Sequence, residues 1–288
     1  MSVSINSPEH TADGAMIELA EKRSATLRDR RNFLSTIGVA GAAVSLGAMN
    51  GCSDDGPIAL PATAPSVVDV LNFALNLEYL EASFYLFVAT GSGLPAADMG
   101  GSPGQVSGGA KVTFVNPVVA SVAAQLATDE REHVEFLRST ISSIGGVPVD
   151  MPALNLAAGG TVNSDATFLA AARQLEAVGI SAYIGGAQFL TSSAAALTYA
   201  AQILDTEAQH EGFLRELCIV LGVASPAVDS QDMPPTAVKV FNTSPSTGLN
   251  PVRTTSQVLQ IVYNTPGTLG STKGGFFPNG LNGPITIS

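Results

Sequence analysis

The chain has 288 residues and a formal net charge of −11, with 24 acidic against 13 basic residues. Such an acidic surface repels nucleic acid, so we exclude that class of partner. Its two cysteines, Cys52 and Cys218, lie in different surroundings and do not predict a disulfide framework, and we interpret Cys218 as a small buried apolar residue.

The first 51 residues are predicted to form a twin-arginine-type signal peptide. Arg30-Arg31 is followed by Phe33-Leu34 and then by a run of small and apolar residues at positions 36–48. This run is shorter than the roughly 20 residues that a membrane-spanning helix needs, and a buried core helix is the alternative. The twin-arginine route carries proteins that have already folded. We therefore expect an exported protein, located in the periplasm or the cell envelope.

Cys52 offers a site for attachment to a membrane. Gly51 before Cys52 resembles a lipoprotein processing site, although Met49-Asn50 fits the preceding positions poorly. A lipid anchor at Cys52 is therefore a hypothesis. Residues 52–65 lack periodicity and are predicted to be a linker.

Four amphipathic segments follow and predict a helical bundle over residues 66–222. The first begins at Ser66, where Asp69 three positions later completes a capping-box pattern. The expected helices cover residues 66–90, 117–146, 164–190 and 194–222. The long connection between the second and third helices predicts a single crossover, whereas the Gly-rich loop between the first two is interpreted as a decoration.

Residues 223–288 are predicted to form an irregular extension that wraps the bundle, because Pro, Gly, Asn, Ser and Thr dominate there. Within it, residues 258–263 fit either a strand or a short helix. Phe276 and Phe277 argue against a disordered tail, since such tails are poor in aromatic residues. The predicted fold class is all-α: a four-helix bundle with one long crossover and an irregular C-terminal extension.

Two of the three histidines have a glutamate three residues earlier, in Glu130-Arg-Glu-His133 and Glu207-Ala-Gln-His210. On a helix, this spacing places both side chains on one face, with Cβ atoms about 5–6 Å apart. The same three residues, Phe-Leu-Arg, follow each histidine after a gap of two. A lone pair of this kind is usually a solvated helix face, but the repetition indicates two copies of a site.

The first and third expected helices carry a second repeat. Glu78 is followed seven residues later by Tyr85, and Glu176 is followed seven residues later by Tyr183. Seven residues make two helical turns, so each tyrosine shares a face with its glutamate. We interpret the tyrosines first as core aromatics, with a supporting or redox role beside the glutamates as the alternative. Together the repeats predict a bundle with pseudo-twofold symmetry.

This pattern resembles that of ferritin-like di-iron and di-manganese carboxylate proteins, and residues 66–288 are similar to exported ferritin-like proteins related to desiccation-associated proteins. The resemblance implies two iron or manganese ions, with zinc as an alternative. It implies six ligands: Glu78 and Glu176 for one ion each, Glu130 and Glu207 as bridges, and His133 and His210 for one ion each. Two divalent ions would cancel four carboxylate charges that are costly to bury alone.

Two further glutamates are candidates for supporting roles or extra ligands. Glu81 shares the face of the first ligand helix, and its counterpart in the repeat is Gly179. Glu211 occupies the position that corresponds to Val134 in the other copy. We leave the catalytic residues unassigned.

The resemblance supports three hypotheses for function. The first is an oxidoreductase that acts on a small-molecule oxidant, O2 or peroxide, in the manner of a peroxidase, catalase or ferroxidase. The second is a desiccation- or stress-related structural protein in which the metals only stabilise the bundle. The third is an iron-storing shell, against which the export signal, the long first loop and the extension argue. Association with further copies of the chain is left open.

Overall fold

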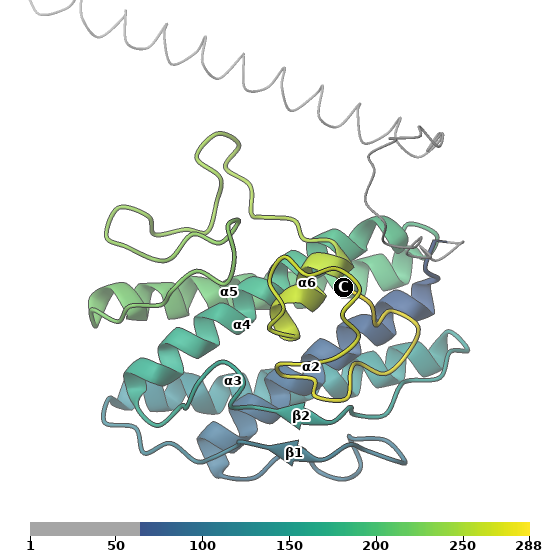
Figure 1. Ribbon diagram of the computed structural model, residues 1–288, viewed down its shortest axis with the longest axis horizontal. Coiled ribbons are helices and arrows are strands. Elements are labelled where there is room, and N and C mark those ends of the chain that lie inside the picture. The colour runs from purple at the N-terminus through teal and green to yellow at the C-terminus, as the bar shows by residue number, and fades with distance from the viewer. Residues whose placement is uncertain (1–63) are drawn as a thin grey trace, which may run out of the picture. The chain divides into compact units, whose positions relative to one another are not determined.

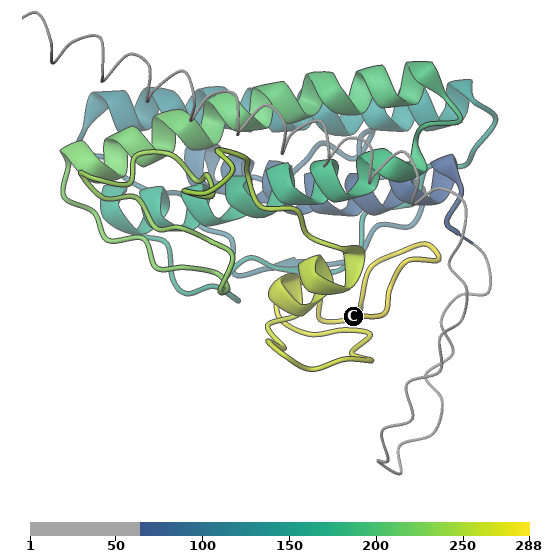
Figure 2. The same cartoon turned by 90° about the horizontal axis from the view of Figure 1, so that it is seen from above.

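The computed structural model describes residues 64–288. The predicted signal peptide and the proposed anchor at Cys52 lie outside the described residues, as does nearly all of the predicted linker. In the described part, four long helices run alongside one another (Figure 1 and Figure 2): α2 (Val67–Thr90), α3 (Pro117–Ser143), α4 (Asp165–Gly186) and α5 (Ala194–Val220).

The order in which the helices pack confirms the predicted fold class. Helix α2 packs against α3 and α4, and α5 packs against α4 and α3. Helices α3 and α4 follow each other in the chain but lie diagonally in the bundle, so residues 144–164 cross from one side to the other. The chain is therefore an all-α bundle with a single crossover, as the connection lengths predicted.

Local sequence signals set the helix ends. The Ser66 hydroxyl accepts a hydrogen bond from the amide of Asp69 at 3.2 Å, and the Asp69 carboxylate accepts one from the amide of Ser66 at 2.9 Å. This capping box starts α2, which ends at Gly91, whose φ of 85° is a conformation that glycine adopts without strain. Helix α4 ends earlier than expected, at Gly186, and continues as the 3-10 turn η2 (Ala187–Phe189).

The loop after α2 is joined to the crossover. Strand β1 (Val106–Ser107) lies in the loop, strand β2 (Leu154–Asn155) lies in the crossover, and the two pair in parallel. Gly104 packs so closely here that a Cβ atom would lie 2.2 Å from the amide nitrogen of Ala153. The loop that we interpreted as a decoration therefore holds the crossover against the bundle.

The C-terminal extension is ordered against the bundle. Residues 258–263, which fitted either a strand or a short helix, lie mostly in helix α6 (Thr255–Val262). Phe277 is fully buried, and its ring lies 6.4 Å from that of Tyr263. Near the C-terminus, the Asn282 amide donates to the side chain of Asn76 on α2 at 2.9 Å. The extension thus closes over α2 and the crossover.

Buried arginines fasten this extension to α4. Arg173 on α4 donates to both carboxylate oxygens of Asp232, at 2.8 and 2.6 Å. Arg253 in the extension donates to Ser181 Oγ on α4 at 2.8 Å, and it also binds both oxygens of Asp229, within the extension, at 2.7 and 2.8 Å. Gly185 allows the close approach, because a Cβ atom there would lie 2.0 Å from the Arg253 carbonyl oxygen.

Among the helices of residues 64–288, none combines the length and the apolar content that crossing a bilayer requires.

Candidate metal centre

All four long helices contribute to one buried cluster of carboxylates and imidazoles. The contributing residues are Glu78 on α2, Glu130 and His133 on α3, Glu176 on α4, and Glu207 and His210 on α5. The glutamate side chains are at most 1% exposed and the imidazoles are 10–11% exposed. The structure therefore brings together the six side chains that the repeat singled out.

The donor atoms form two overlapping groups of four, and within each group all donors lie within 4.8 Å of one another. One group is Glu78, Glu130, His133 and Glu207, and the other is Glu130, Glu176, Glu207 and His210. Glu130 and Glu207 belong to both groups. This arrangement suits a dinuclear centre, in which two carboxylates would serve both ions and the other ligands would serve one ion each.

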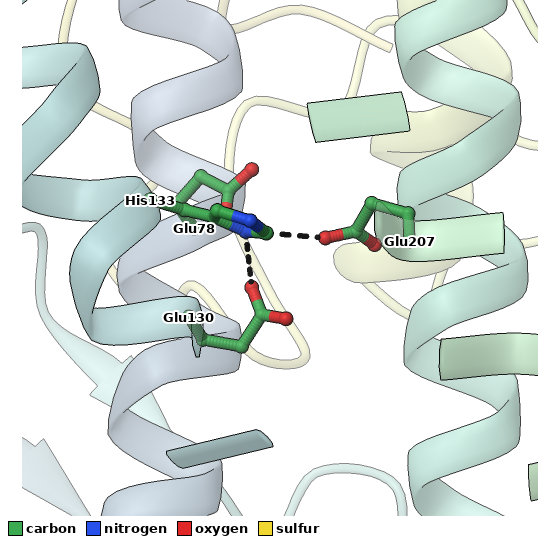
Figure 3. A group of neighbouring side chains, drawn as sticks. All are labelled: Glu78, Glu130, His133 and Glu207. Carbon is green, nitrogen blue, oxygen red and sulfur yellow. Dashed lines mark hydrogen bonds and ion pairs between the residues drawn. The ribbon is translucent and has the colours of Figure 1, made fainter. Parts of the chain in front are cut away.

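Figure 3 shows the His133 imidazole among three carboxylates from three different helices. Its Nδ1 atom lies 3.0 Å from Glu130 Oε2, 3.3 Å from Glu78 Oε2 and 3.5 Å from Glu207 Oε1. Donors that each bind an ion at about 2 Å are separated by distances of this size. The His133 group therefore has the dimensions of a single cation site.

The second imidazole lies in a matching position. His210 Nδ1 is 3.1 Å from Glu130 Oε1 and 3.3 Å from Glu176 Oε2. The two imidazole ring centres are 6.3 Å apart, with the carboxylate of Glu130 reaching both rings. Both histidines thus direct Nδ1 toward the shared carboxylates.

Polar atoms without hydrogen bonds show that the residues fit a pair of cations. They are buried and inward-facing: Glu78 Oε2, Glu130 Oε1, Glu176 Oε2, both oxygens of Glu207, and His210 Nδ1. In the described part of the chain, Thr265 Oγ1 is the remaining atom of this kind. Buried polar groups are nearly always paired, so such a cluster calls for a partner. Two divalent cations would supply one and would balance the four carboxylate charges.

Without cations, this cluster must hold protons. Burial and the neighbouring Glu130 and Glu176 carboxylates raise the pKa of Glu207 well above its usual range. Burial raises the pKa of Glu130 to about 7, although the neighbouring His133 and His210 imidazoles oppose the shift. Burial alone would lower the pKa of His210, but the Glu130 and Glu176 carboxylates outweigh it and raise that pKa to about 11. Metal ions would therefore displace protons from the site.

Each of the two tyrosines of the repeat donates a hydrogen bond to the glutamate on the other helix. Tyr85 on α2 donates a hydrogen bond to Glu176 Oε1 on α4 at 2.5 Å, and Tyr183 on α4 donates one to Glu78 Oε1 on α2. Each phenol occupies one oxygen of its glutamate and leaves Oε2 directed at the cluster. The geometry therefore favours the supporting role over the first interpretation as simple core aromatics.

Asp129 is a supporting residue that the sequence analysis missed. Its Oδ2 atom lies 3.3 Å from His210 Nε2, on the far side of the ring from the cluster. A carboxylate there holds the ring proton on Nε2 and leaves Nδ1 as the donor to a metal. In the other copy the corresponding residue is Thr206, whose hydroxyl donates to the Gln202 carbonyl at 3.2 Å. Because the contact is not duplicated, the repeat could not reveal it.

The two extra glutamates have different positions. Glu81 lies at the edge of the cluster, and a Cβ atom at Gly179 would lie 3.3 Å from Glu81 Oε1 and 2.7 Å from Glu207 Oε2. Glu211 lies in an ion pair with Arg215, at 3.2 Å, and belongs to neither donor group. It lies one turn beyond Glu207 on α5, but its carboxylate is directed at Arg215 and not at the cluster.

Residues 66–219 match the sequence profile of the family described as Ferritin-like domain. This match covers more than half of the 288 residues. The chain therefore belongs to the ferritin-like domain family, as the repeated ligand pattern predicted.

Relatives with descriptive names share parts of the chain. It is 36% identical over 100 residues to the ferritin-like catalase Nec2 of Nesocodon mauritianus, a match that covers 33% of this chain and 30% of the relative. It is 27% identical over 168 residues to the desiccation-related protein PCC13-62 of Craterostigma plantagineum, covering 53% of each. The chain thus spans about half or less of the length of these relatives. A solved structure described as ferritin-like, diiron-carboxylate proteins from Bacillus anthracis str. Ames is 20% identical, with a TM-score of 0.39, over 52% of this chain and 94% of that one.

Proposed function

We propose that this chain is an exported dinuclear metal oxidoreductase that consumes peroxide. The observation that carries the proposal is the sharing of Glu130 and Glu207 between two four-donor groups. Two ions held by common carboxylates lie close enough to act together on one small oxidant. The name of one relative, a ferritin-like catalase, agrees with peroxide as the substrate.

Iron or manganese fits the proposed activity, since both suit carboxylate and imidazole ligands. Zinc would bind the same donors but has no redox chemistry. When bound, the metal pair would exchange two electrons, so that one peroxide is oxidised to O2 with loss of two protons and a second takes up two protons and becomes two waters.

Residues of the chain would bind the ions and control their surroundings. Glu78 and Glu176 would each offer one oxygen, because Tyr183 and Tyr85 hold the other. Burial of the cluster would limit access of bulk water and so strengthen the electrostatic interactions inside it. Glu81, a buried carboxyl group at the edge of the cluster, is placed to pass protons to and from a bound oxidant.

Metal analysis followed by an oxygen assay tests this proposal. The full chain is loaded with Mn(II) or Fe(II), its metal content is measured, and O2 release from peroxide is followed with an electrode. We expect two ions per chain and sustained O2 release. Glu130→Ala and His210→Ala should lose more than about 100-fold in rate, since even indirect supports of a metal are worth 10–100-fold. Glu132→Ala, at an exposed position of α3, serves as the matched control. No O2 release from a chain that carries both ions would overturn the assignment.

A structural role is the second candidate, favoured by the desiccation-related relative. In this case the ions would neutralise four buried carboxylates and thereby stabilise the bundle. Tightly bound zinc, no peroxide turnover and a large fall in Tm on chelation would support it. Turnover by the iron or manganese form would refute it.

Export remains part of the proposal and rests on the Arg30-Arg31 pair and the apolar run after it. Mass spectrometry of the protein from fractionated cells provides the test. A mature N-terminus near residue 52 in the envelope or periplasmic fraction would support export, and a lipid mass on Cys52 would support anchoring. An intact N-terminus in the cytosolic fraction would refute both.

A further inference from the structure

A cavity of about 560 Å³ lies between the bundle and the C-terminal extension. Helices α2 and α4 form one wall, and residues 228–231 together with the region of α6 form another. Part of the crossover, including Gly159 and Gly160, completes the lining. Liquid water occupies about 30 Å³ per molecule, so the cavity is far larger than peroxide requires. Its volume is in the range of sites for small organic ligands, about 300–1,000 Å³.

This cavity extends to Gly179, beside the candidate metal centre. Glu81 and Gly179 both line the cavity. A Cβ atom at Gly179 would lie 2.7 Å from Glu207 Oε2. Because residue 179 is a glycine, no side chain at this position lies between the cavity and this shared ligand. The repeat places Glu81 and Gly179 at equivalent positions on α2 and α4. The pseudo-twofold symmetry is therefore broken at the place where the cavity meets the cluster.

The walls of the cavity indicate the chemistry of its occupant. Among the described residues that line it there is no lysine, arginine or histidine, and the Asp229 carboxylate is already bonded to Arg253. The side-chain oxygens of Gln257 and Gln260 accept hydrogen bonds from backbone amides at 2.9 and 3.1 Å. Their NH2 groups therefore remain as hydrogen-bond donors to an occupant of the cavity. The remaining lining is mainly apolar and includes Leu77, Leu80, Phe84, Val178, Ile261 and Phe276. Such walls suit a neutral, apolar molecule with a hydrogen-bond acceptor.

We propose that this cavity binds a neutral, mainly apolar organic molecule carrying a hydrogen-bond acceptor, and holds it beside the metal centre. The binding itself depends on the cavity alone. That the molecule lies beside a metal centre rests on the function proposed above.

The test uses prodan, a neutral naphthalene ketone whose emission shifts to the blue in apolar surroundings, as the probe of the full chain. We expect saturable binding, and weaker binding of anilinonaphthalene sulfonate, because the lining residues that the structure describes offer no cation to its sulfonate. Prodan emission should be lower with the cobalt-loaded chain than with the zinc-loaded chain, since Co(II) quenches a fluorophore bound near it. Equal emission from both forms would place the probe elsewhere and overturn the proposal.

Two variants fill the cavity from different elements, Ala171→Trp on α4 and Ala158→Trp on the crossover. Each should weaken prodan binding at least tenfold, whereas Ala166→Trp, at an exposed position of α4, should leave it unchanged. Unaltered binding to both filled variants, with unaltered circular dichroism, would overturn the proposal. If neither variant folds, the cobalt and zinc comparison on the unmodified chain decides.

The two proposals fail in distinguishable ways. A chain that binds prodan but takes up no metal, or releases no O2 from peroxide, would refute the proposed function and leave the cavity assignment standing. A metal-loaded, active chain without saturable prodan binding would refute the cavity assignment alone.

Discussion

Tyr183 on α4 donates its phenolic hydrogen bond to Glu78 on α2, so a residue of one half of the repeat positions a candidate ligand of the other half. The phenol holds Oε1 of the glutamate, and Oε2 faces the cluster, 3.3 Å from His133 Nδ1. The orientation of this carboxylate is thus set from across the bundle.

Replacing this phenol should loosen metal binding. Tyr183→Phe removes the donor to Glu78 and leaves a buried carboxylate oxygen without its partner. We expect affinity for the first-row divalent ions to fall by about 10–100-fold, measured by competition with a chromophoric chelator. Tyr199→Phe is the matched control, because Tyr199 packs on Phe136 away from the cluster. Equal affinity in Tyr183→Phe and the wild type would contradict this account of the hydrogen bond.

Asp129→Asn should affect one ion more than the other. The Asp129 carboxylate lies against His210 Nε2, and the structure gives His133 no equivalent contact among the described residues. An asparagine amide at position 129 no longer favours the His210 tautomer in which Nδ1 is free to bind a metal. The affinity for the ion on the His210 side should therefore fall by about tenfold or more. Stepwise titration with Co(II), followed by its absorption bands, separates the two ions. Asp205→Asn, on the exposed side of α5, should titrate like the wild type.

Metal binding should release protons and weaken as the pH falls. In the metal-free cluster the pKa of His210 is raised to about 11 by the Glu130 and Glu176 carboxylates, against the effect of burial, and that of His133 is also raised. Both imidazoles are therefore protonated from pH 6 to 9, and an ion must displace a proton from each. Glu130 has a pKa of about 7, so toward pH 6 it also carries a proton that a metal ion must displace.

Calorimetry in two buffers of different ionisation enthalpy checks the number of protons. We expect at least about two per dinuclear site, with the apparent affinity rising as the pH is raised from 6 to 9. An affinity that is flat over this range would show that the imidazoles are already neutral before the metal binds.

Asp229→Asn should destabilise the attachment of the extension. Arg253 is fully buried and would lose its charged partner, although Ser181 and Ala177 remain as acceptors. We expect a loss of about 2 kcal/mol in the free energy of unfolding at pH 7. This is below the roughly 3–5 kcal/mol of a fully buried pair, because the Asp229 side chain is 24% exposed. Urea denaturation followed by circular dichroism measures the difference.

The sign of the pH dependence follows from the Asp229 carboxyl group. Burial would raise its pKa, but the hydrogen bonds and charge of Arg253 outweigh burial and lower the pKa below the usual 3.8. The stabilisation is therefore present above the unfolded-state pKa and is lost as the pH falls through the folded-state pKa. The wild type and Asp229→Asn should differ at pH 7, and the difference should shrink as the pH falls below 3.8. A constant difference would assign the effect to something other than this ionisation.

The helices and the six clustered side chains were accessible to sequence reasoning because they repeat. Glu130 with His133 and Glu207 with His210 have helical spacing, and that spacing fixes a common face before any tertiary contact is known. The same is true of the helix starts, where a capping residue such as Ser66 acts on amides two or three positions away.

What the sequence analysis missed depends on contacts between distant segments. The spacing of Glu78 and Tyr85 places them on one face, but it does not show that Tyr85 bonds Glu176. The partner of Arg253 lies 24 residues away in irregular backbone, where no periodicity relates the two positions. The cavity at Gly179 likewise depends on how the extension packs on α4.

Because each half of the bundle supplies the phenol for the other, a single helical hairpin cannot build a complete half-site. A hairpin of α2 and α3 would carry its own carboxylates and imidazole, but the hydroxyl that orients Glu78 belongs to α4. Two identical hairpins that met face to face would complete one another. The crossover makes permanent, within one polypeptide, an association that two separate hairpins would need in order to hold two ions.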